Sequence, residues 1–149
     1  MAAKVCVVSS CGGHLTEVLE LLPEDPTLQY VYVINDATRA FEGLSRRIYF
    51  VAHSERDWKF VLNLFEAWRI LRSEQPHILI STGAGVIVPF ALVGRLLFGT
   101  RVIFVETIAR LSKPSLTARL MYYLAHDFYF QWSSLKPFFP KGTCIEIST

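Results

Sequence analysis

The stretch from residue 5 to residue 21 reads VCVVSSCGGHLTEVLEL, and it predicts a strand, a glycine turn and a helix in immediate succession. Its first part is a continuous apolar run of the kind found in the middle of a parallel sheet. The adjacent glycines Gly12 and Gly13 let the backbone approach a ligand closely. The first turn of the following helix points free N–H groups at the same place, and it contains His14, which can exchange a proton near neutral pH. The stretch therefore predicts a place that holds an oxygen-rich ligand and moves a proton.

The composition is that of an apolar chain with room for one core. At 149 residues we expect a single domain spanning residues 1–149. Hydrophobic residues make up 52% of the chain and charged residues 19%, and the mean hydropathy is +0.33. Part of this apolar excess should therefore be covered by a partner chain or a membrane surface. The net charge of +2 and the lack of a Lys/Arg run argue against nucleic acid as a partner.

Cysteine usage and the start of the chain favour a cytoplasmic location. Cys6, Cys11 and Cys144 are odd in number and share no metal-ligand spacing, so we expect neither a disulfide framework nor a metal site. Cys6 is interpreted as a small core residue of the first strand. That strand begins almost at the first residue, so no signal peptide or anchor is expected ahead of it. The longest apolar run, residues 86–97, is interrupted by Arg95 and is too short to span a bilayer.

Strand and helix patterns alternate along the chain. Strands are predicted at residues 4–9, 30–34, 46–51, 77–81, 101–105, 128–130 and 144–147. Helices are predicted at residues 13–22, 58–73, 86–98 and 116–125, with a loop at residues 35–38. This alternation predicts an α/β fold with a doubly wound, mostly parallel sheet.

The helix predicted at residues 58–73 has the clearest amphipathic pattern in the chain. One stripe of it is polar and comprises Lys59, Asn63, Glu66, Arg69 and Ser73. The opposite stripe is apolar and aromatic and comprises Trp58, Val61, Leu62, Phe65 and Trp68. Since apolar stripes normally face the core, we expect this second stripe to be buried.

Polar clusters follow three of the predicted strands. They are Ser9–His14, Ser81–Gly85 and Glu106–Arg110. The second cluster repeats the arrangement of the first, because a glycine turn directly follows a strand and opens a helix. Ligands of parallel α/β sheets bind at the carboxyl ends of the strands, which meet at one edge. We therefore expect the three clusters to converge on one site.

Each part of this expected site also has a purely structural interpretation. Gly12 and Gly13 match neither a dinucleotide fingerprint, since the third glycine is missing, nor a Walker-type phosphate loop, since no Gly-Lys-Ser/Thr follows. They could form only a tight turn, and His14 could be a helix residue without chemistry. Glu106 could pair with Arg110 in a structural ion pair, or it could accept hydrogen bonds from a sugar hydroxyl or orient a catalytic group.

Two further segments have alternative interpretations as core or as contact surface. The helices predicted at residues 86–98 and 116–125 are either buried core or an apolar patch that rests on anionic lipid. The cations expected around such a patch are Arg95, Arg101, Lys113 and Arg119. Residues 138–140, with the sequence Phe-Phe-Pro, are expected to be exposed and to belong to a partner interface.

Several blocks of this sequence resemble one known family. They are SCGGHLTE at residues 10–17, FVETIAR at residues 104–110, SLT at residues 115–117 and DFYFQW at residues 127–132. Together they resemble the acceptor-side subunits of split GT-B glycosyltransferases. These include the bacterial PssD-type polysaccharide subunits and the membrane-anchoring subunit of the eukaryotic dolichol-linked N-acetylglucosaminyltransferase. The chain is similar, more distantly, to the N-terminal half of the N-acetylglucosaminyltransferase that forms lipid II, which implies a Rossmann-like N-terminal half of a GT-B enzyme.

The resemblance implies a glycosyltransferase subunit that is active only with its partner. In such an inverting enzyme a C-terminal-half subunit holds the UDP-sugar, and this chain holds a polyprenyl-diphosphate-linked saccharide acceptor. The product belongs to exopolysaccharide, capsule or lipid-linked oligosaccharide synthesis. No cofactor or metal is expected, and the heterodimer is expected to be peripheral on the cytoplasmic face of the membrane. The alternatives are a non-catalytic membrane adaptor that recruits and activates a transferase, and a free-standing nucleotide-binding domain with other chemistry.

On this reading the site residues have distinct roles. His14 is expected to be the general base, and Glu106 to steer it or to bind acceptor hydroxyls. The two glycine turns are expected to cradle the acceptor or its diphosphate, and Arg110 to contact the diphosphate. The expected substrate-binding residues are Ser10, Cys11, Gly12, Gly13, Thr82, Gly83, Ala84, Gly85 and Arg110.

Overall fold

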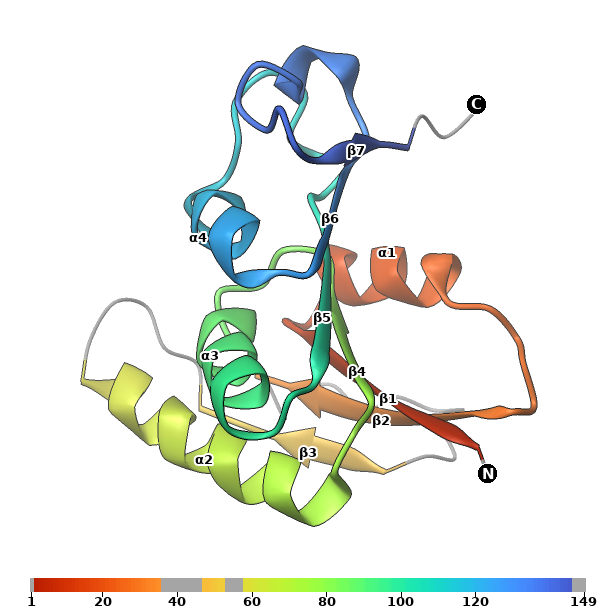
Figure 1. The fold of residues 1–149 in the computed structure, drawn as a ribbon, viewed down its shortest axis with the longest axis vertical. Coiled ribbons are helices and arrows are strands. Elements are labelled where there is room, and N and C mark those ends of the chain that lie inside the picture. Colours follow the sequence, from red (N-terminus) through yellow and green to blue (C-terminus); the bar gives the residue numbers. More distant parts are fainter. Residues whose placement is uncertain (1, 36–46, 53–57, 146–149) are drawn as a thin grey trace.

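The computed structural model describes residues 2–35, 47–52 and 58–145, and within them the chain forms one seven-stranded sheet (Figure 1). The strands are β1 (Ala3–Ser9), β2 (Leu28–Ile34), β3 (Ile48–Phe50), β4 (Ile78–Ser81), β5 (Arg101–Val105), β6 (Asp127–Phe130) and β7 (Thr143–Cys144). The helices are α1 (Gly13–Leu21), α2 (Lys59–Glu74), α3 (Ile87–Leu97), α4 (Leu116–Leu124) and the short 3₁₀ helix η1 (Ser133–Leu135). All strand pairs are parallel, which confirms the predicted fold class.

The strand order places the expected site at the centre of the sheet. The order is β3-β2-β1-β4-β5-β6-β7, so β1 and β4 are neighbours although they are far apart in the chain. Strands β2 and β3 lie on one side of β1. After β3 the chain crosses to the other side of β1 and adds β4 to β7 there. Such a switch point leaves a crevice at the carboxyl ends of the strands, where open α/β sheets bind ligands.

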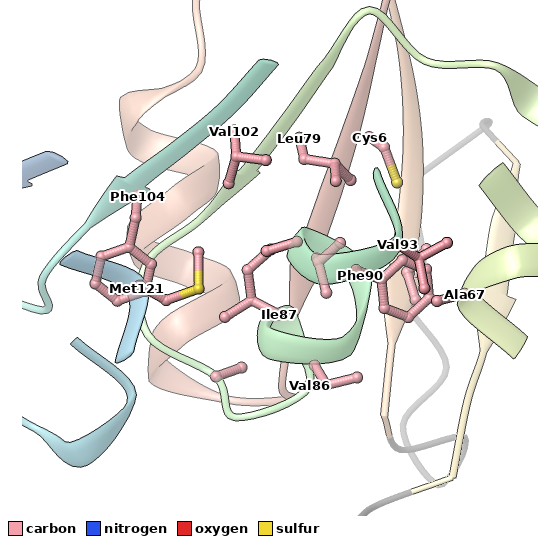
Figure 2. Packing of buried hydrophobic residues seen from close by; sticks show 14 of the residues in the cluster. Cys6, Ala67, Leu79, Val86, Ile87, Phe90, Val93, Val102, Phe104 and Met121 are labelled. Carbon is pink, nitrogen blue, oxygen red and sulfur yellow. The ribbon is translucent and has the colours of Figure 1, made fainter. Parts of the chain in front are cut away.

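The two faces of the sheet are covered by different helices (Figure 1). Val5 and Val7 of β1 pack with Leu15 and Val18 of α1 on one face. The alternate β1 residues, which include Cys6, join the larger cluster formed with α2, α3 and α4 on the other face. Figure 2 shows this larger cluster, with side chains from the sheet and from α3 and α4 gathered around Ile87 and Phe90. Cys6 is completely buried, as expected of a core cysteine.

The C-terminal segment differs from its prediction at two places. The expected exposed stretch at residues 138–140 is wrong for Phe139, which is 1% exposed, whereas Phe138 is 45% exposed. The Phe139 ring centroid lies 4.6 Å from that of Phe128, so this phenylalanine closes the core over β6. The last strand is Thr143–Cys144, and residues 146 and 147 of its prediction lie outside the described part.

Two other predictions also reach into residues that the structure leaves undescribed. The predicted strand at 46–51 is observed as Ile48–Phe50, and residue 46 lies outside the described part. Residues 36–38 of the predicted loop also lie outside it.

Helix α2 does not bury most of its aromatic stripe, contrary to the prediction, although Trp68 packs against the core. The aromatic stripe that was expected to face the core is largely exposed: Trp58 is 71% exposed, Val61 67%, Leu62 44% and Phe65 61%. The buried face instead consists of Asn63, Ala67, Ile70, Leu71 and Glu74. The physical reason lies in the second half of the helix, where Ile70 and Leu71 join the core cluster formed with α3 and the sheet. Once that half is docked, the bulky first-half residues lie on the outer side.

The surface expected on α3 and α4 is only partly exposed. Most of α3 is core, and its exposed apolar residues Leu96 and Leu97 lie at its C-terminal end. Helix α4 is more open, with Leu116, Leu120 and Tyr123 on its outer side. Two of the cations expected around the patch have internal partners. Arg95 donates to the carbonyl oxygen of Leu124 at 2.8 Å, and the Nε of Arg101 lies 2.6 Å from Asp127 Oδ2.

A buried glutamate joins three elements at the amino-terminal edge of the sheet. The Glu74 side chain at the end of α2 is 1% exposed and accepts hydrogen bonds from Lys4 Nζ at 3.0 Å and Arg47 Nη1 at 2.9 Å. The Tyr49 hydroxyl donates to the same carboxylate at 2.5 Å. Burial raises the pKa of Glu74, but the hydrogen bonds from Tyr49, Arg47 and Lys4 outweigh it and lower the pKa to about 2.

Stability in acid is expected to depend on this carboxylate. Because the pKa of Glu74 is lowered from 4.5 to about 2, the ionised carboxylate stabilises the fold fully above about pH 5. This stabilisation is lost as the pH falls from 4.5 to about 2. The loss corresponds to about 3 kcal/mol by the relation between pKa and free energy. Chemical denaturation at pH values from 7 to 2 gives the free energy of unfolding as a function of pH. This free energy should fall in the wild type and fall less in Glu74→Gln, whereas Glu24→Gln, at an exposed position, should behave as the wild type. An equal fall in Glu74→Gln and wild type would contradict this role of Glu74.

Candidate functional site

A cavity of about 910 Å³ lies at the carboxyl edge of the sheet and is lined from the first turns of α1, α2, α3 and α4. Its polar lining consists of His14, Thr107, Arg110, Ser115 and Thr117. Its apolar lining consists of Phe60, Val88, Ala109, Leu116 and Leu120, and the backbone of Gly83 and Gly85 completes it. Helices that alternate with parallel strands begin at this edge, so their N–H groups and positive dipole ends point to the same space.

The two glycine turns meet directly, as predicted. Gly12 and Gly83 have φ angles of 100° and 132°, which residues with a side chain rarely adopt. A Cβ atom at Gly83 would lie 3.2 Å from Cε1 of His14, so the absence of a side chain leaves room for the imidazole. The Thr82 hydroxyl donates to the backbone carbonyl of His14 at 2.8 Å, which fixes the start of α1 against the turn after β4.

His14 occupies the centre of this arrangement. The residue is half-buried and lines the cavity. Its Nδ1 atom is buried and has no hydrogen-bond partner among the described residues. Because Nδ1 faces away from solvent, exchange of a proton with a ligand in the cavity is left to Nε2. An imidazole so placed can exchange a hydrogen bond or a proton with a ligand in the cavity.

Glu106 lies behind the cavity and does not line it. It is fully buried at the end of β5 and accepts hydrogen bonds from the backbone N–H groups of Thr107 at 3.1 Å and Ser115 at 2.9 Å. The Ser115 hydroxyl, 3.1 Å from either carboxylate oxygen, also accepts from the Ala118 N–H at 3.0 Å and so caps α4. In the described part of the chain Glu106 forms no ion pair with Arg110, which is exposed in the cavity. The carboxylate therefore fixes the loop after β5 to the start of α4.

A second hydrogen-bond network was missed from the sequence. The Glu17 carboxylate on α1 accepts from the Thr107 hydroxyl at 2.8 Å and from the Ile108 N–H at 2.7 Å. Gln131, after β6, donates from Nε2 to Glu17 at 2.6 Å and to the Glu106 carbonyl oxygen at 3.0 Å. Both residues lie in blocks that carry the family resemblance, which is the signal that could have pointed to them. The network holds the loop after β5 against α1, and so sets one wall of the cavity.

The remaining predicted site residues are near the cavity without lining it. Thr82 and Ala84 are buried, the first bonded to His14 and the second packed in the core. Cys11 donates its backbone N–H to Asn35 Oδ1 at 3.3 Å. Of the predicted site residues the cavity is lined by His14, Gly83, Gly85 and Arg110, whereas Ser10, Cys11, Gly12, Gly13, Thr82, Ala84 and Glu106 do not line it.

Two features are absent from the described residues. No group of three or more His, Cys, Asp or Glu side chains there is arranged to hold a metal ion. None of the described helices combines the length and the apolar character needed to cross a bilayer.

The parallel sheet with its switch point and its cavity at the carboxyl edge is a Rossmann-like arrangement, and similar solved structures show that its fold is that of one half of a GT-B protein. Similar solved structures include MurG of Acinetobacter baumannii, with a TM-score of 0.76 and 19% identity over 96% of this chain and 44% of that one. A UDP-N-acetylglucosamine 2-epimerase of Rickettsia bellii has a TM-score of 0.71 and 11% identity over 94% of this chain and 42% of that one. The chain thus spans less than half the length of these structures.

Residues 49–147 match the family described as "Oligosaccharide biosynthesis protein Alg14 like", and the chain belongs to this family. It is 25% identical to the human UDP-N-acetylglucosamine transferase subunit ALG14, over 93% of this chain and 79% of that protein. Over shorter stretches it is 32% identical to the Saccharomyces cerevisiae protein of the same name, covering 41% of this chain and 29% of that one. The resemblance seen in the sequence blocks is confirmed.

Proposed function

We propose that this chain is the acceptor-binding subunit of a two-component inverting glycosyltransferase. A partner subunit supplies a UDP-sugar, and the sugar moves to a polyprenyl-diphosphate-linked saccharide held here. The products are lipid-linked oligosaccharides or precursors of exopolysaccharide or capsule. The observation that carries the proposal is the position of His14, which lines a large cavity beside two glycine turns and Arg110. Relatives named as subunits of a UDP-N-acetylglucosamine transferase support it.

The diphosphate of the acceptor fits the start of α1. The N-cap residue Gly12 does not cap this helix with a side chain, and the N–H groups of Gly13 and His14 donate to none of the described residues, so they remain available to an anion. At the start of α3 the N–H groups of Ile87 and Val88 instead donate to the carbonyl oxygens of Ala84 and Gly85. Arg110 faces the same cavity and can bind phosphate oxygens in a bidentate manner. A diphosphate bound there would leave the attached sugar beside His14.

His14 is the general base of the proposed reaction. An acceptor hydroxyl attacks the anomeric carbon of the donor sugar, its proton passes to Nε2 of His14, and UDP leaves with the bonding electron pair. The attack from the face opposite UDP inverts the anomeric configuration. Glu106 is a positioning residue in this mechanism, because its carboxylate is bonded to Thr107 and Ser115 and holds the cavity wall next to the imidazole.

The proposed partner is supported by relatives that are named as subunits of a UDP-N-acetylglucosamine transferase. The chain spans 44% of the length of the A. baumannii MurG structure, and the proposal assigns the nucleotide-sugar pocket to a C-terminal-half subunit that forms a heterodimer with it. The chain is proposed to be peripheral on the cytoplasmic face of the membrane, where a lipid-linked acceptor is accessible. Catalysis is proposed to need no metal or other cofactor.

Ligand binding by the isolated chain tests whether this chain binds the acceptor and leaves the UDP-sugar to the partner. Calorimetric titration with short-chain prenyl-diphosphate monosaccharides should give saturable binding. UDP-glucose, UDP-galactose, UDP-glucuronic acid and UDP-N-acetylglucosamine should each bind at least 100-fold more weakly, because the donor pocket lies on the partner. Arg110→Ala should weaken acceptor binding about tenfold, whereas Arg119→Ala, at an exposed arginine of α4 that does not line the cavity, should not. Tight binding of a UDP-sugar would favour a free-standing nucleotide-binding domain instead.

A further inference from the structure

The loop after β5 brings side chains to the cavity without a helix or strand of its own. It comprises residues 106–115, between β5 and α4. Three of its residues line the cavity, namely Thr107, Ala109 and Arg110. The Arg110 side chain is exposed and forms no ion pair with a described residue. Its position therefore depends on the path of the loop backbone.

Glu17 ties this loop to α1. Its carboxylate accepts hydrogen bonds from the Thr107 hydroxyl at 2.8 Å and from the Ile108 N–H at 2.7 Å. Hydrogen bonds to an ionised acceptor are shorter and stronger than those between neutral groups, so they hold the loop firmly against the helix. Glu17 lies one helical turn after His14 on α1. The same rigid element therefore carries the imidazole and the anchor of the loop.

Gln131 holds the loop from the side of β6. The residue is 4% exposed, and its Nε2 donates both to Glu17 at 2.6 Å and to the carbonyl oxygen of Glu106 at 3.0 Å. These two acceptors require a donor, because a carboxylate at residue 131 would bring a second negative charge against Glu17. The neighbouring Trp132 donates from Nε1 to the Ile108 carbonyl oxygen at 2.7 Å. Side chains from outside the loop thus hold both polar backbone groups of Ile108.

We propose that Glu17 and Gln131 are positioning residues that hold Arg110 at the separation from His14 that the acceptor requires. This inference rests on the proposed function, in which Arg110 binds the diphosphate and His14 takes the proton of the attacking hydroxyl. Because the diphosphate and the hydroxyl belong to one ligand, the two protein groups must keep a fixed separation to bind both. Neither Glu17 nor Gln131 lines the cavity, so each acts through the loop.

A double-mutant cycle on acceptor binding tests whether Glu17 acts through Arg110. The isolated protein is titrated with a short-chain prenyl-diphosphate monosaccharide. Glu17→Gln replaces one acceptor oxygen with a donor and should weaken binding about fivefold. In the Arg110→Ala background the same change should weaken binding no further, because the group that it misplaces is gone. Independent effects would instead multiply, to about 50-fold in the double variant.

Two further variants complete the design. Glu20→Gln is the matched control, since Glu20 is exposed on the same helix, and it should bind the acceptor as the wild type does. Gln131→Met removes both donors at similar volume and should repeat the loss and its dependence on Arg110. In the reconstituted enzyme Glu17→Gln and Gln131→Met should raise the KM for the acceptor and leave the KM for the UDP-sugar unchanged. A general loss of stability would not separate the two KM values.

The outcomes separate this inference from the proposed function. Wild-type affinity in both Glu17→Gln and Gln131→Met would overturn the positioning role and leave the acceptor role standing. Losses that multiply with that of Arg110→Ala would overturn it in the same way, because the two residues would then act elsewhere. If the wild type binds a UDP-sugar and not the acceptor, the proposed function fails and the positioning role falls with it.

Discussion

Replacing His14 with glutamine is expected to lower the turnover number of the reconstituted two-subunit enzyme about 100- to 10,000-fold, the range that general-base catalysis contributes. Glutamine keeps the polar character and approximate size of the side chain but cannot accept a proton at neutral pH. The residue lies at the surface of the cavity and outside the core, so the fold should survive the change. Acceptor affinity should change only a few-fold, because the diphosphate contacts are made elsewhere. The effect should therefore fall on kcat and leave KM nearly unchanged.

The control is His77→Gln at the opposite edge of the sheet. His77 is exposed and accepts a hydrogen bond from the Lys4 N–H at 3.1 Å, a contact that a glutamine side chain can replace. This variant should transfer sugar at the wild-type rate. If His14→Gln instead keeps activity within a few-fold of wild type, the base lies on the partner. Transfer by the partner alone to a soluble acceptor would then favour the non-catalytic adaptor.

The second large effect is expected from Gly83→Ala, which adds one methyl group next to the imidazole. The φ angle of 132° at Gly83 is unfavourable for alanine, and the new Cβ would lie 3.2 Å from Cε1 of His14. The turn or the ring must shift by a few tenths of an ångström or more. Because small misplacements of a catalytic group lower rates strongly, we expect kcat to fall about 100-fold. Kinetics of the reconstituted pair, with thermal unfolding measured in parallel, check this expectation.

Gly99→Ala separates the cost to the backbone from the effect on catalysis. Gly99 follows α3 with a φ angle of 63°, and nothing lies within 4 Å of the position of its Cβ. Alanine there should destabilise the fold by about 1 kcal/mol, as at other left-handed positions, and leave kcat unchanged. If both variants lose activity to the same extent, stability explains the loss and the packing of Gly83 against His14 does not matter.

The centre of the molecule was predictable from local patterns. Residues 5–21 have the pattern of an apolar strand, a glycine turn and the start of a helix. The same order of strand, glycine turn and helix recurs around Thr82–Gly85. Parallel strands bring such turns to one edge whatever the details of packing, so the meeting of Gly83 with His14 followed from topology. Arg110 reached the same cavity for the same reason.

The orientation of α2 was not predictable from its own pattern. The helix carries two candidate inner faces, and the stronger aromatic one is exposed. The buried face includes Glu74, whose ionic partner Lys4 is 70 residues distant in the sequence. A hydrophobic pattern compares the stripes of a helix by their apolar character, and it contains no information on ionic partners that are distant in the sequence. The apolar lining of the cavity was also missed, because its residues come from three separate helices and from Ala109 in the loop after β5.

Glu106 illustrates a further limit of sequence reasoning. Its place at the end of an apolar strand suggested a role in steering the base or binding the acceptor, and the structure places it behind the cavity with its oxygens bonded to Thr107 and Ser115. The role of a carboxylate depends on which donors surround it, and those donors come from a loop whose path the sequence does not define. Glu17 and Gln131 were overlooked for the same reason.

The central claim is that the acceptor, and not the nucleotide-sugar, binds beside His14. The direct measurement is a titration of the isolated chain with each ligand class while the imidazole NMR signals of His14 are followed, with His77 as an internal reference. We expect saturable shifts of the His14 signals with the short-chain diphosphate-linked sugar, no shift of the His77 signals, and no response to UDP-sugars. Shifts of the His14 signals by a UDP-sugar, with none from the acceptor, would contradict the account.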